Sequence, residues 1–258
     1  MKRRPMPDTI SIITAAFNAE ASIAGCLKSV AGQTVACQHL IIDGGSTDST
    51  FSFLENYKGH PITWRSAPDR GVYDAMNQGI AMATGDIIGI LNADDSYASG
   101  DVLAAVLEAF AAPGVDACYG DLCYVDAENP AKIIRYWRAG NFSPQAFYWG
   151  WMPPHPTFFV RRQIYERHGG FNLALGSAAD YELMLRFLLR YRIKAAYIPK
   201  ILVHMRPGGI SNRNLANRLR ANRNDRRAWT VNGLTPLPWT LLAKPLRKIG
   251  QWLSRPPI

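Results

Sequence analysis

Acidic and amide side chains follow apolar runs in this sequence, at the points where the runs end. The run over residues 87–91 is followed by Asn92, Asp94 and Asp95, and the run that starts at residue 39 ends at Asp43. A carboxylate at the edge of an apolar core is costly unless a cation or hydrogen-bond donors lie against it. Because ligands of open parallel sheets bind beyond the carboxyl ends of the strands, these side chains predict one polar ligand site.

The order of the apolar runs predicts an α/β protein. In the first 110 residues, the predicted strands are residues 9–16, 39–43, 62–65 and 87–91, and the predicted helices are residues 23–30, 46–57, 71–83 and 102–110. This alternation is typical of a Rossmann-like, mainly parallel sheet flanked by helices. A mixed half follows, with predicted strands at 116–124, 132–137, 157–161, 193–198 and 201–206 and a predicted helix at 178–191. We expect residues 1–212 to form one domain.

The composition restricts the class of protein. Of the 258 residues, 48% are hydrophobic, which is enough for one sizeable core. The four cysteines lack the spacing of a zinc site and predict reduced core side chains. No stretch is long and apolar enough for a transmembrane helix. The first predicted strand-to-helix turn, AAFNAEAS, lacks the glycines of a dinucleotide-binding site, which argues against that function.

Six stretches of the sequence, in order, resemble glycosyltransferase family 2. They are SIITAAFNAE, IIDGGSTDST, PDRGVYDAMNQGIAMATGDIIGILNADD, PTFFVRR followed by YERHGGFN, AADYELMLR and GGIS, and they extend over residues 9–212. The resemblance implies the GT-A fold. It also implies transfer of a sugar from a nucleotide-sugar donor to a hydroxyl group, with inversion at the anomeric carbon.

The resemblance implies roles for two carboxylates. Residues 92–94 fall where the family has its DxD motif, so Asp94 would bind a divalent cation, Mg²⁺ or Mn²⁺, that offsets the charge of the leaving diphosphate. Asp180 falls where the family places its catalytic base, which takes the proton of the attacking acceptor hydroxyl. Asn92 replaces the first acid of the motif and can offer only a neutral contact. Asp95 would support Asp94 or bind sugar hydroxyls.

Other residues in or near these stretches would contact the nucleotide or the acceptor. Asp43 would accept a hydrogen bond from the base, which leaves UDP-, dTDP- and GDP-linked donors open. His204 is a candidate for the metal or the diphosphate, and His155 for the acceptor side. The remaining residues expected on the nucleotide side are Ala16, Phe17, Asp69, Arg70, Gly71 and Asn77.

Structural interpretations compete with several of these roles. Asp43 could be a turn residue of the DGGS segment, and Asp94 and Asp95 could cap the helix that follows them. The segment that ends at Asp180 resembles a helix capping box. His155 could be a structural histidine in a proline-rich turn. The alternative from another functional class is a non-catalytic protein that binds a sugar nucleotide or a polysaccharide.

The net charge of +9 belongs to the C-terminal segment. Residues 213–258 contain ten basic residues and one acid, Asp225, whereas residues 1–212 are balanced. Tryptophan and leucine follow at helical spacing, which predicts a basic amphipathic tail on an anionic membrane surface. Nucleic-acid binding and a disordered, solvated tail are the alternatives. The membrane interpretation predicts a cytoplasmic protein attached peripherally to the inner face of the cytoplasmic membrane, where a lipid-linked saccharide of surface polysaccharide biosynthesis would be the acceptor.

Overall fold

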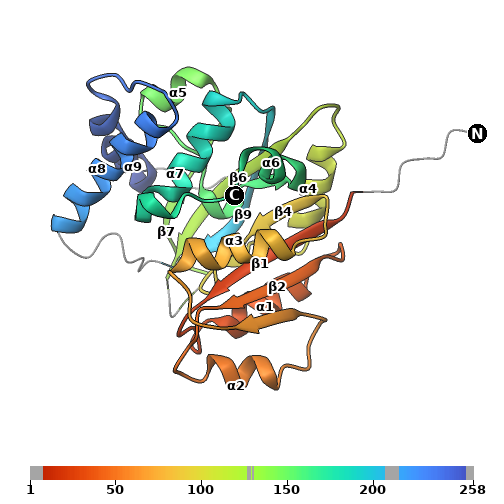
Figure 1. Ribbon diagram of the computed structural model, residues 1–258. Coiled ribbons are helices and arrows are strands. Elements are labelled where there is room, and N and C mark those ends of the chain that lie inside the picture. Colours follow the sequence, from red (N-terminus) through yellow and green to blue (C-terminus); the bar gives the residue numbers. More distant parts are fainter. Residues whose placement is uncertain (1–7, 127–128, 130, 207–214, 254–258) are drawn as a thin grey trace, which may run out of the picture.

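The computed structural model describes residues 8–126, 129, 131–206 and 215–253. Within these residues a nine-stranded mixed sheet has the order β3-β2-β1-β4-β8-β6-β9-β5, with β7 paired to β6 (Figure 1). The strands are β1 Ile10–Ala16, β2 Gln38–Asp43, β3 Thr63–Ser66, β4 Ile87–Ile90, β5 Ser96–Tyr97, β6 Ala117–Val125, β7 Ile133–Trp137, β8 Phe159–Arg161 and β9 Ala195–Met205.

Helices cover both faces of this sheet. The α-helices are α1 Ile23–Ala31, α2 Thr50–Glu55, α3 Val72–Met82, α4 Val102–Phe110, α5 Pro144–Tyr148, α6 Arg162–His168, α7 Ala179–Met184, α8 Leu215–Val231 and α9 Thr240–Leu253. Two 3₁₀-helices, η1 His155–Thr157 and η2 Leu173–Ala178, and a π-helix, η3 Leu185–Arg190, connect them. In Figure 1, α5, α7, α8 and α9 gather at one end of the molecule and α2 lies at the other.

The first half has the parallel arrangement that the alternating pattern predicts. β1 pairs in parallel with β2 and β4, and β2 pairs in parallel with β3. Successive side chains of β1 enter different cores, since Ile12 packs with residues of α1 and α4 and Ile13 packs with residues of α3. Because helices bury both faces, β1, β2 and β4 have no solvent-facing side and their sequences are almost continuously apolar, whereas the edge strand β3 is partly exposed.

The second half differs from the prediction at several elements, including the unpredicted helices α5 and α6. The predicted strands at 193–198 and 201–206 are one strand, β9, whose register with β6 shifts around Asp121. Pro199 interrupts the apolar pattern but is exposed within β9, where the irregular pairing tolerates a residue without an N–H group. The predicted helix at 178–191 is divided into α7 and the π-helix η3.

The described part of the C-terminal segment is helical and docked. Trp229 of α8 is fully buried, and its Nε1 donates a hydrogen bond to the Tyr181 hydroxyl of α7 at 3.0 Å. Lys244 of α9 forms an ion pair of 2.8 Å with Asp225 of α8. The disordered-tail interpretation is therefore wrong for the described residues. None of the described helices combines the length and apolar character needed to cross a membrane.

A chain of hydrogen bonds begins at a buried histidine between β1 and β2. His39 Nε2 lies 3.0 Å from Thr14 Oγ1, and His39 Nδ1 lies 2.9 Å from His60 Nε2. The other ring nitrogen of His60 lies 2.9 Å from the Tyr57 hydroxyl. Burial, together with the neighbouring His60, lowers the pKa of His39 to about 3. The folded protein therefore keeps His39 neutral at pH values at which an unfolded chain protonates it.

We expect stability to fall as the pH drops below about 6.5, the usual histidine pKa. Below this pH the unfolded chain binds a proton at His39, whereas the folded protein does not. This group therefore lowers the free energy of unfolding by up to ~1.4 kcal/mol per pH unit. Urea unfolding at about pH 7.5 and about pH 5.5 measures the slope, and His39→Gln should make it shallower. An identical slope in both proteins would contradict the depressed pKa of His39.

Candidate active site

The carboxyl ends of the first strands form one polar edge of the sheet. Ala16, the last residue of β1, is in register with Asp43 at the end of β2, which is in register with Ser66 at the end of β3. The backbone N–H of Ala93 donates to the carbonyl of Ala15 at 3.3 Å, which brings the stretch after β4 to the same edge. The convergence expected for strand ends in a parallel sheet is therefore present.

The Asp43 carboxylate is buried and closes its own turn. Its Oδ2 accepts hydrogen bonds from the backbone N–H groups of Gly45 at 3.2 Å and Ser46 at 3.0 Å. Oδ2 also accepts from the Ser66 hydroxyl at 2.5 Å, and Oδ1 accepts from the Ser46 hydroxyl. These contacts are the ones expected if Asp43 acts as a turn residue of the DGGS segment. A bond from Asp43 to a nucleotide base stays a prediction that must compete with these donors.

Phe17 presents an exposed ring directly after β1, with 63% of its surface accessible. The next residue, Asn18, has a left-handed φ of 49°. Its Oδ1 accepts from the Thr47 N–H at 2.9 Å, and its own N–H donates to the Ser46 hydroxyl at 2.8 Å. These bonds join the loops after β1 and β2 and leave the Phe17 ring available to a planar ligand.

Residues 69–71 lie opposite the turn after β2. A Cβ atom at Gly44 would be 2.8 Å from Asp69 Oδ2, so the Asp69 carboxylate lies directly against the backbone of this turn. Asp69 Oδ1 accepts a hydrogen bond from the Gly71 N–H at 2.7 Å. The exposed Arg70 side chain pairs with Asp74 at 2.8 Å. The three residues thus border the polar edge, and their nucleotide contacts stay predictions.

The stretch after β4 separates its two acids. Asp94 is exposed, whereas Asp95 is only 2% exposed. Asp95 accepts from Asn92 Nδ2 at 3.0 Å and lies near Arg206, which directly follows β9. Burial, and then the charge of Asp94, raises the pKa of Asp95 well above its usual range. The residue before α4 is Asp101, and neither Asp94 nor Asp95 caps that helix, so the capping interpretation is wrong.

Two buried oxygens in this stretch, Asn92 Oδ1 and Asp95 Oδ1, lack a hydrogen-bond partner. Such an oxygen is costly unless a ligand lies against it. His204 of β9 pairs across strands with Ser96 of β5, the residue that directly follows Asp95. With the exposed Asp94, these groups are the candidate ligands of a divalent cation, which would take its other ligands from substrate phosphates and water. The described residues contain no cluster of three or more histidines, cysteines and acids that would hold a metal alone.

Asp180 lies in the first turn of α7 without capping it. The residue that precedes this helix is Ala178, and no side-chain cap bond forms there. Asp180 Oδ1 instead accepts a hydrogen bond from the N–H of the next residue, Tyr181, at 2.7 Å. The capping-box interpretation is therefore wrong. The Asp180 side chain is half-buried.

Two aromatic side chains from distant segments lie beside Asp180. Tyr73, in the first turn of α3, is within hydrogen-bonding reach, and burial reinforced by the charge of Asp180 raises the pKa of Tyr73 well above its usual value. Burial lowers the pKa of His155 in η1, and the charge of Asp180 opposes this shift. Both rings pack on Phe171, at centroid distances of 5.2 Å and 5.4 Å. The fold thus brings the predicted base and the predicted acceptor-side histidine together.

Asn77 and Glu182 make structural contacts. Asn77 is predicted on the nucleotide side, but its amide bonds to both backbone groups of Phe171, at 2.9 Å and 2.8 Å. It therefore holds the residue on which Tyr73 and His155 rest. Glu182 is 3% exposed and pairs with Arg186 at 3.0 Å, which leaves Asp180 as the candidate base of this helix.

Tyr73 and Arg206 are site residues that sequence spacing does not single out. Tyr73 follows Gly71 by two positions in the stretch PDRGVYDAMN, and this proximity is its only signal. Arg206 follows a strand whose pairing partner cannot be read from the sequence. Both come to the site through contacts between segments about 100 residues apart.

Known sequences and structures resemble this chain. Residues 11–173 match Glycosyl transferase family 2. The chain is 34% identical over 184 residues to an uncharacterized glycosyltransferase of Mycobacterium tuberculosis, covering 70% of this chain and 69% of the relative. It is 31% identical over 207 residues to a PGL/p-HBAD biosynthesis glycosyltransferase of Mycobacterium bovis, covering 78% of each chain.

A solved structure shares the architecture. The mannosyltransferase PcManGT from Pyrobaculum calidifontis, in complex with GDP-Man and Mn²⁺, superposes with a TM-score of 0.63 at 20% identity, over 93% of this chain and 70% of the other. This likeness confirms the predicted GT-A-type α/β fold. Because the family match extends over more than half of the residues, the chain belongs to glycosyltransferase family 2.

Proposed function

We propose that this glycosyltransferase moves a sugar, with inversion, from a nucleoside diphosphate donor to a hydroxyl of a saccharide acceptor. The observation that carries the proposal is the separation of two carboxylates. Asp94 is exposed at the polar edge beside the partnerless oxygen of Asn92, and Asp180 lies on another element beside Tyr73 and His155. One carboxylate can thus serve the donor diphosphate and the other the acceptor.

The donor side would use the polar edge. Phe17 would cover the base, and the exposed Arg70 would border the nucleotide. Asp94, Asn92 Oδ1 and His204 would hold a divalent cation, which when bound neutralises the charge of the leaving diphosphate. Because Asn92 is neutral, Asp94 carries the negative charge of this set. The bond from Asn92 Nδ2 to the buried Asp95 fixes the amide, whose oxygen has no hydrogen-bond partner.

The acceptor side would use Asp180 as the base. Its carboxylate would take the proton from the acceptor hydroxyl as that oxygen attacks the anomeric carbon. Direct displacement from the face opposite the leaving group gives inversion. The Tyr181 N–H donates to the carboxylate, the Tyr73 ring lies beside it, and His155 would line the acceptor site.

We place this reaction in glycolipid or polysaccharide biosynthesis, with a lipid-linked saccharide as acceptor, at the inner face of the cytoplasmic membrane. The mycobacterial PGL/p-HBAD biosynthesis relative supports this setting. The basic C-terminal helices would contact the membrane. The donor stays open among UDP-, dTDP- and GDP-linked sugars.

The test is nucleotide release from a panel of UDP-, dTDP- and GDP-sugars with Mn²⁺ and a lipid-linked saccharide. We expect release to depend on one donor and to increase with the acceptor. The alternative function, a non-catalytic protein that binds a sugar nucleotide, predicts donor binding without release. That result would contradict the proposed transfer.

We expect Asp94→Ala to abolish Mn²⁺-dependent donor binding, because the substitution removes the exposed carboxylate of the metal set. A nucleoside diphosphate at about 100 times its Kd stabilises a protein by ~2.7 kcal/mol, which a thermal melt with and without Mn²⁺ resolves. Glu108→Gln is the control, since Glu108 is an exposed acid on α4. A full Mn²⁺-dependent shift in Asp94→Ala would remove Asp94 from the metal site.

A further inference from the structure

α9 is fixed on the rest of the protein through α5. The Thr240 hydroxyl donates to the carbonyl of Tyr148 at 2.8 Å. Gly150, with φ +74°, lies so close to α9 that a Cβ atom there would be 2.4 Å from the backbone nitrogen of Lys244. The Lys244 ammonium in turn lies 3.7 Å above the Tyr181 ring centroid. The C-terminal helices therefore have one orientation relative to α5 and α7.

An exposed apolar surface results from this docking. Trp149, at the end of α5, and Trp239, before α9, are 55% and 43% exposed, and their ring centroids are 5.6 Å apart. Leu242 and Leu246 follow Trp239 at spacings of three and seven residues, on the same helical face, and each is 63% exposed. With Leu237, which is 38% exposed, these residues form what we call the Trp149–Leu246 surface.

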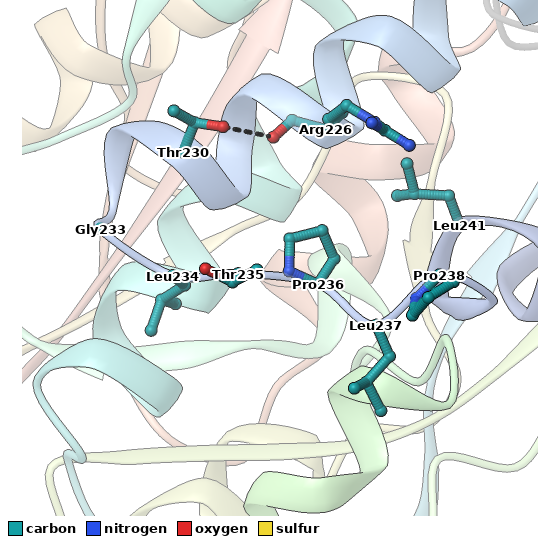
Figure 2. A pocket seen from close by; sticks show the side chains of 9 residues that line it. All are labelled: Arg226, Thr230, Gly233, Leu234, Thr235, Pro236, Leu237, Pro238 and Leu241. Atoms are coloured by element: carbon teal, nitrogen blue, oxygen red, sulfur yellow. Dashed lines mark hydrogen bonds between the residues drawn. The ribbon is translucent and has the colours of Figure 1, made fainter.

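A pocket of about 680 Å³ continues this surface beneath the α8–α9 connection (Figure 2). Leucines and prolines dominate its lining, which consists of Arg226, Thr230, Gly233, Leu234, Thr235, Pro236, Leu237, Pro238 and Leu241. Leu237 belongs to both the pocket and the exposed surface. Arg226 of α8 and Leu241 of α9 both line the pocket (Figure 2).

Exposed cations lie on α8 and α9, the two helices whose residues line the pocket. Arg223, Arg226 and Arg227 of α8 and Arg247 of α9 are exposed, and none forms an ion pair with another described residue. The only acid of the C-terminal segment, Asp225, is already paired with Lys244. The surface therefore combines solvent-exposed tryptophan and leucine side chains with positive charge that no described acid neutralises.

We propose that the Trp149–Leu246 surface docks on a lipid leaflet with anionic headgroups. Tryptophan rings favour the headgroup level, leucines favour the acyl region below it, and arginines bind anionic headgroups. The inference rests on the proposed function, since a leaflet is where a lipid-linked acceptor resides. It goes beyond a basic tail, because Trp149 lies outside the C-terminal segment and is separated from His155 by only five residues. Docking would thus present the acceptor side of the site to the leaflet in a fixed orientation.

The test is co-sedimentation of the full chain with vesicles of phosphatidylglycerol and phosphatidylcholine, compared with phosphatidylcholine alone. We expect Trp149→Ser to weaken binding to anionic vesicles at least about tenfold, and Arg227→Gln to weaken it about fivefold. The controls are Phe51→Ser, an exposed aromatic on α2 at the other end of the molecule, and Lys28→Gln on α1. Both should bind as the wild type does.

Three results would overturn the inference. They are unchanged vesicle binding in Trp149→Ser, equal binding to vesicles without anionic lipid, and binding to single-stranded DNA in place of vesicles. Nucleotide release from the donor without vesicles should be the same in Trp149→Ser and in the wild type, which also shows that the variant folds. If the wild type releases no nucleotide, the proposed function is wrong. Vesicle binding still tests whether the Trp149–Leu246 surface docks on a lipid leaflet.

Discussion

Replacing Asp180 with asparagine should lower kcat for sugar transfer about 1000-fold, or ~4 kcal/mol in activation free energy. Asparagine has nearly the same shape as aspartate and can still accept the hydrogen bond that the Tyr181 N–H donates at 2.7 Å. It cannot take a proton from the acceptor hydroxyl at neutral pH. The loss should therefore fall on the chemical step and leave donor binding in place.

Nucleotide release with donor, Mn²⁺ and acceptor measures this effect, and a thermal melt with donor measures binding. Glu108→Gln makes the same chemical change at an exposed acid on α4 and should keep full activity. Full transfer by Asp180→Asn would exclude Asp180 as the base. Loss of both transfer and donor-induced stabilisation would instead assign Asp180 to the donor site.

Glu182→Ala should lower the free energy of unfolding by ~3–5 kcal/mol. The Glu182 and Arg186 side chains are 4% and 12% exposed, so the substitution leaves the Arg186 charge buried without its acidic partner. Arg186 also donates to the carbonyls of His168, Gly169 and Gly170, which lead to Phe171 beneath the site. Such a loss is a large share of the total stability of about 5–15 kcal/mol that is usual for a folded protein.

Urea unfolding of the wild type and the variant measures this loss. The matched control is Glu166→Ala, because Glu166 and Arg162 form an ion pair of the same spacing at the surface, with side chains 57% and 37% exposed. Removing that pair should cost less than ~1 kcal/mol. Replacing Glu182 and Arg186 together by leucine and methionine should cost less than Glu182→Ala alone. Equal losses at the buried and the exposed pair would contradict this interpretation.

Local sequence patterns locate the elements of the first half and the ends of their strands. β1, β2 and β4 are buried on both faces, so their residues form short apolar runs that stand out from the helical segments between them. Asp43 and Asp94 could be placed at the strand ends for the same reason. The family resemblance added candidate roles for residues 9–212, including Asp180, for which periodicity has no signal.

Contacts between distant segments account for what the sequence left open. The carboxylate of Asp43 is held by its own turn and by Ser66, and the amide of Asn77 is held by the backbone of Phe171. Carboxylates and amides form hydrogen bonds with whichever groups the fold brings to them. Neither partner follows from spacing along the chain. The continuity of β9 could not be predicted either. Its exposed proline interrupts the apolar pattern, and only the pairing with β6 shows that the strand continues through it.

The sequence alone determined the family, the parallel first half, the acids at the strand ends and the position of the basic charge, because each depends on residue type and local order. The folded chain was needed to show that Asp94 is exposed and Asp95 buried, since the two are adjacent in sequence and chemically identical. It was also needed to bring Tyr73 and His155 to Asp180, and Trp149 to Trp239. These neighbours come from packing between elements far apart along the chain, which local periodicity does not encode.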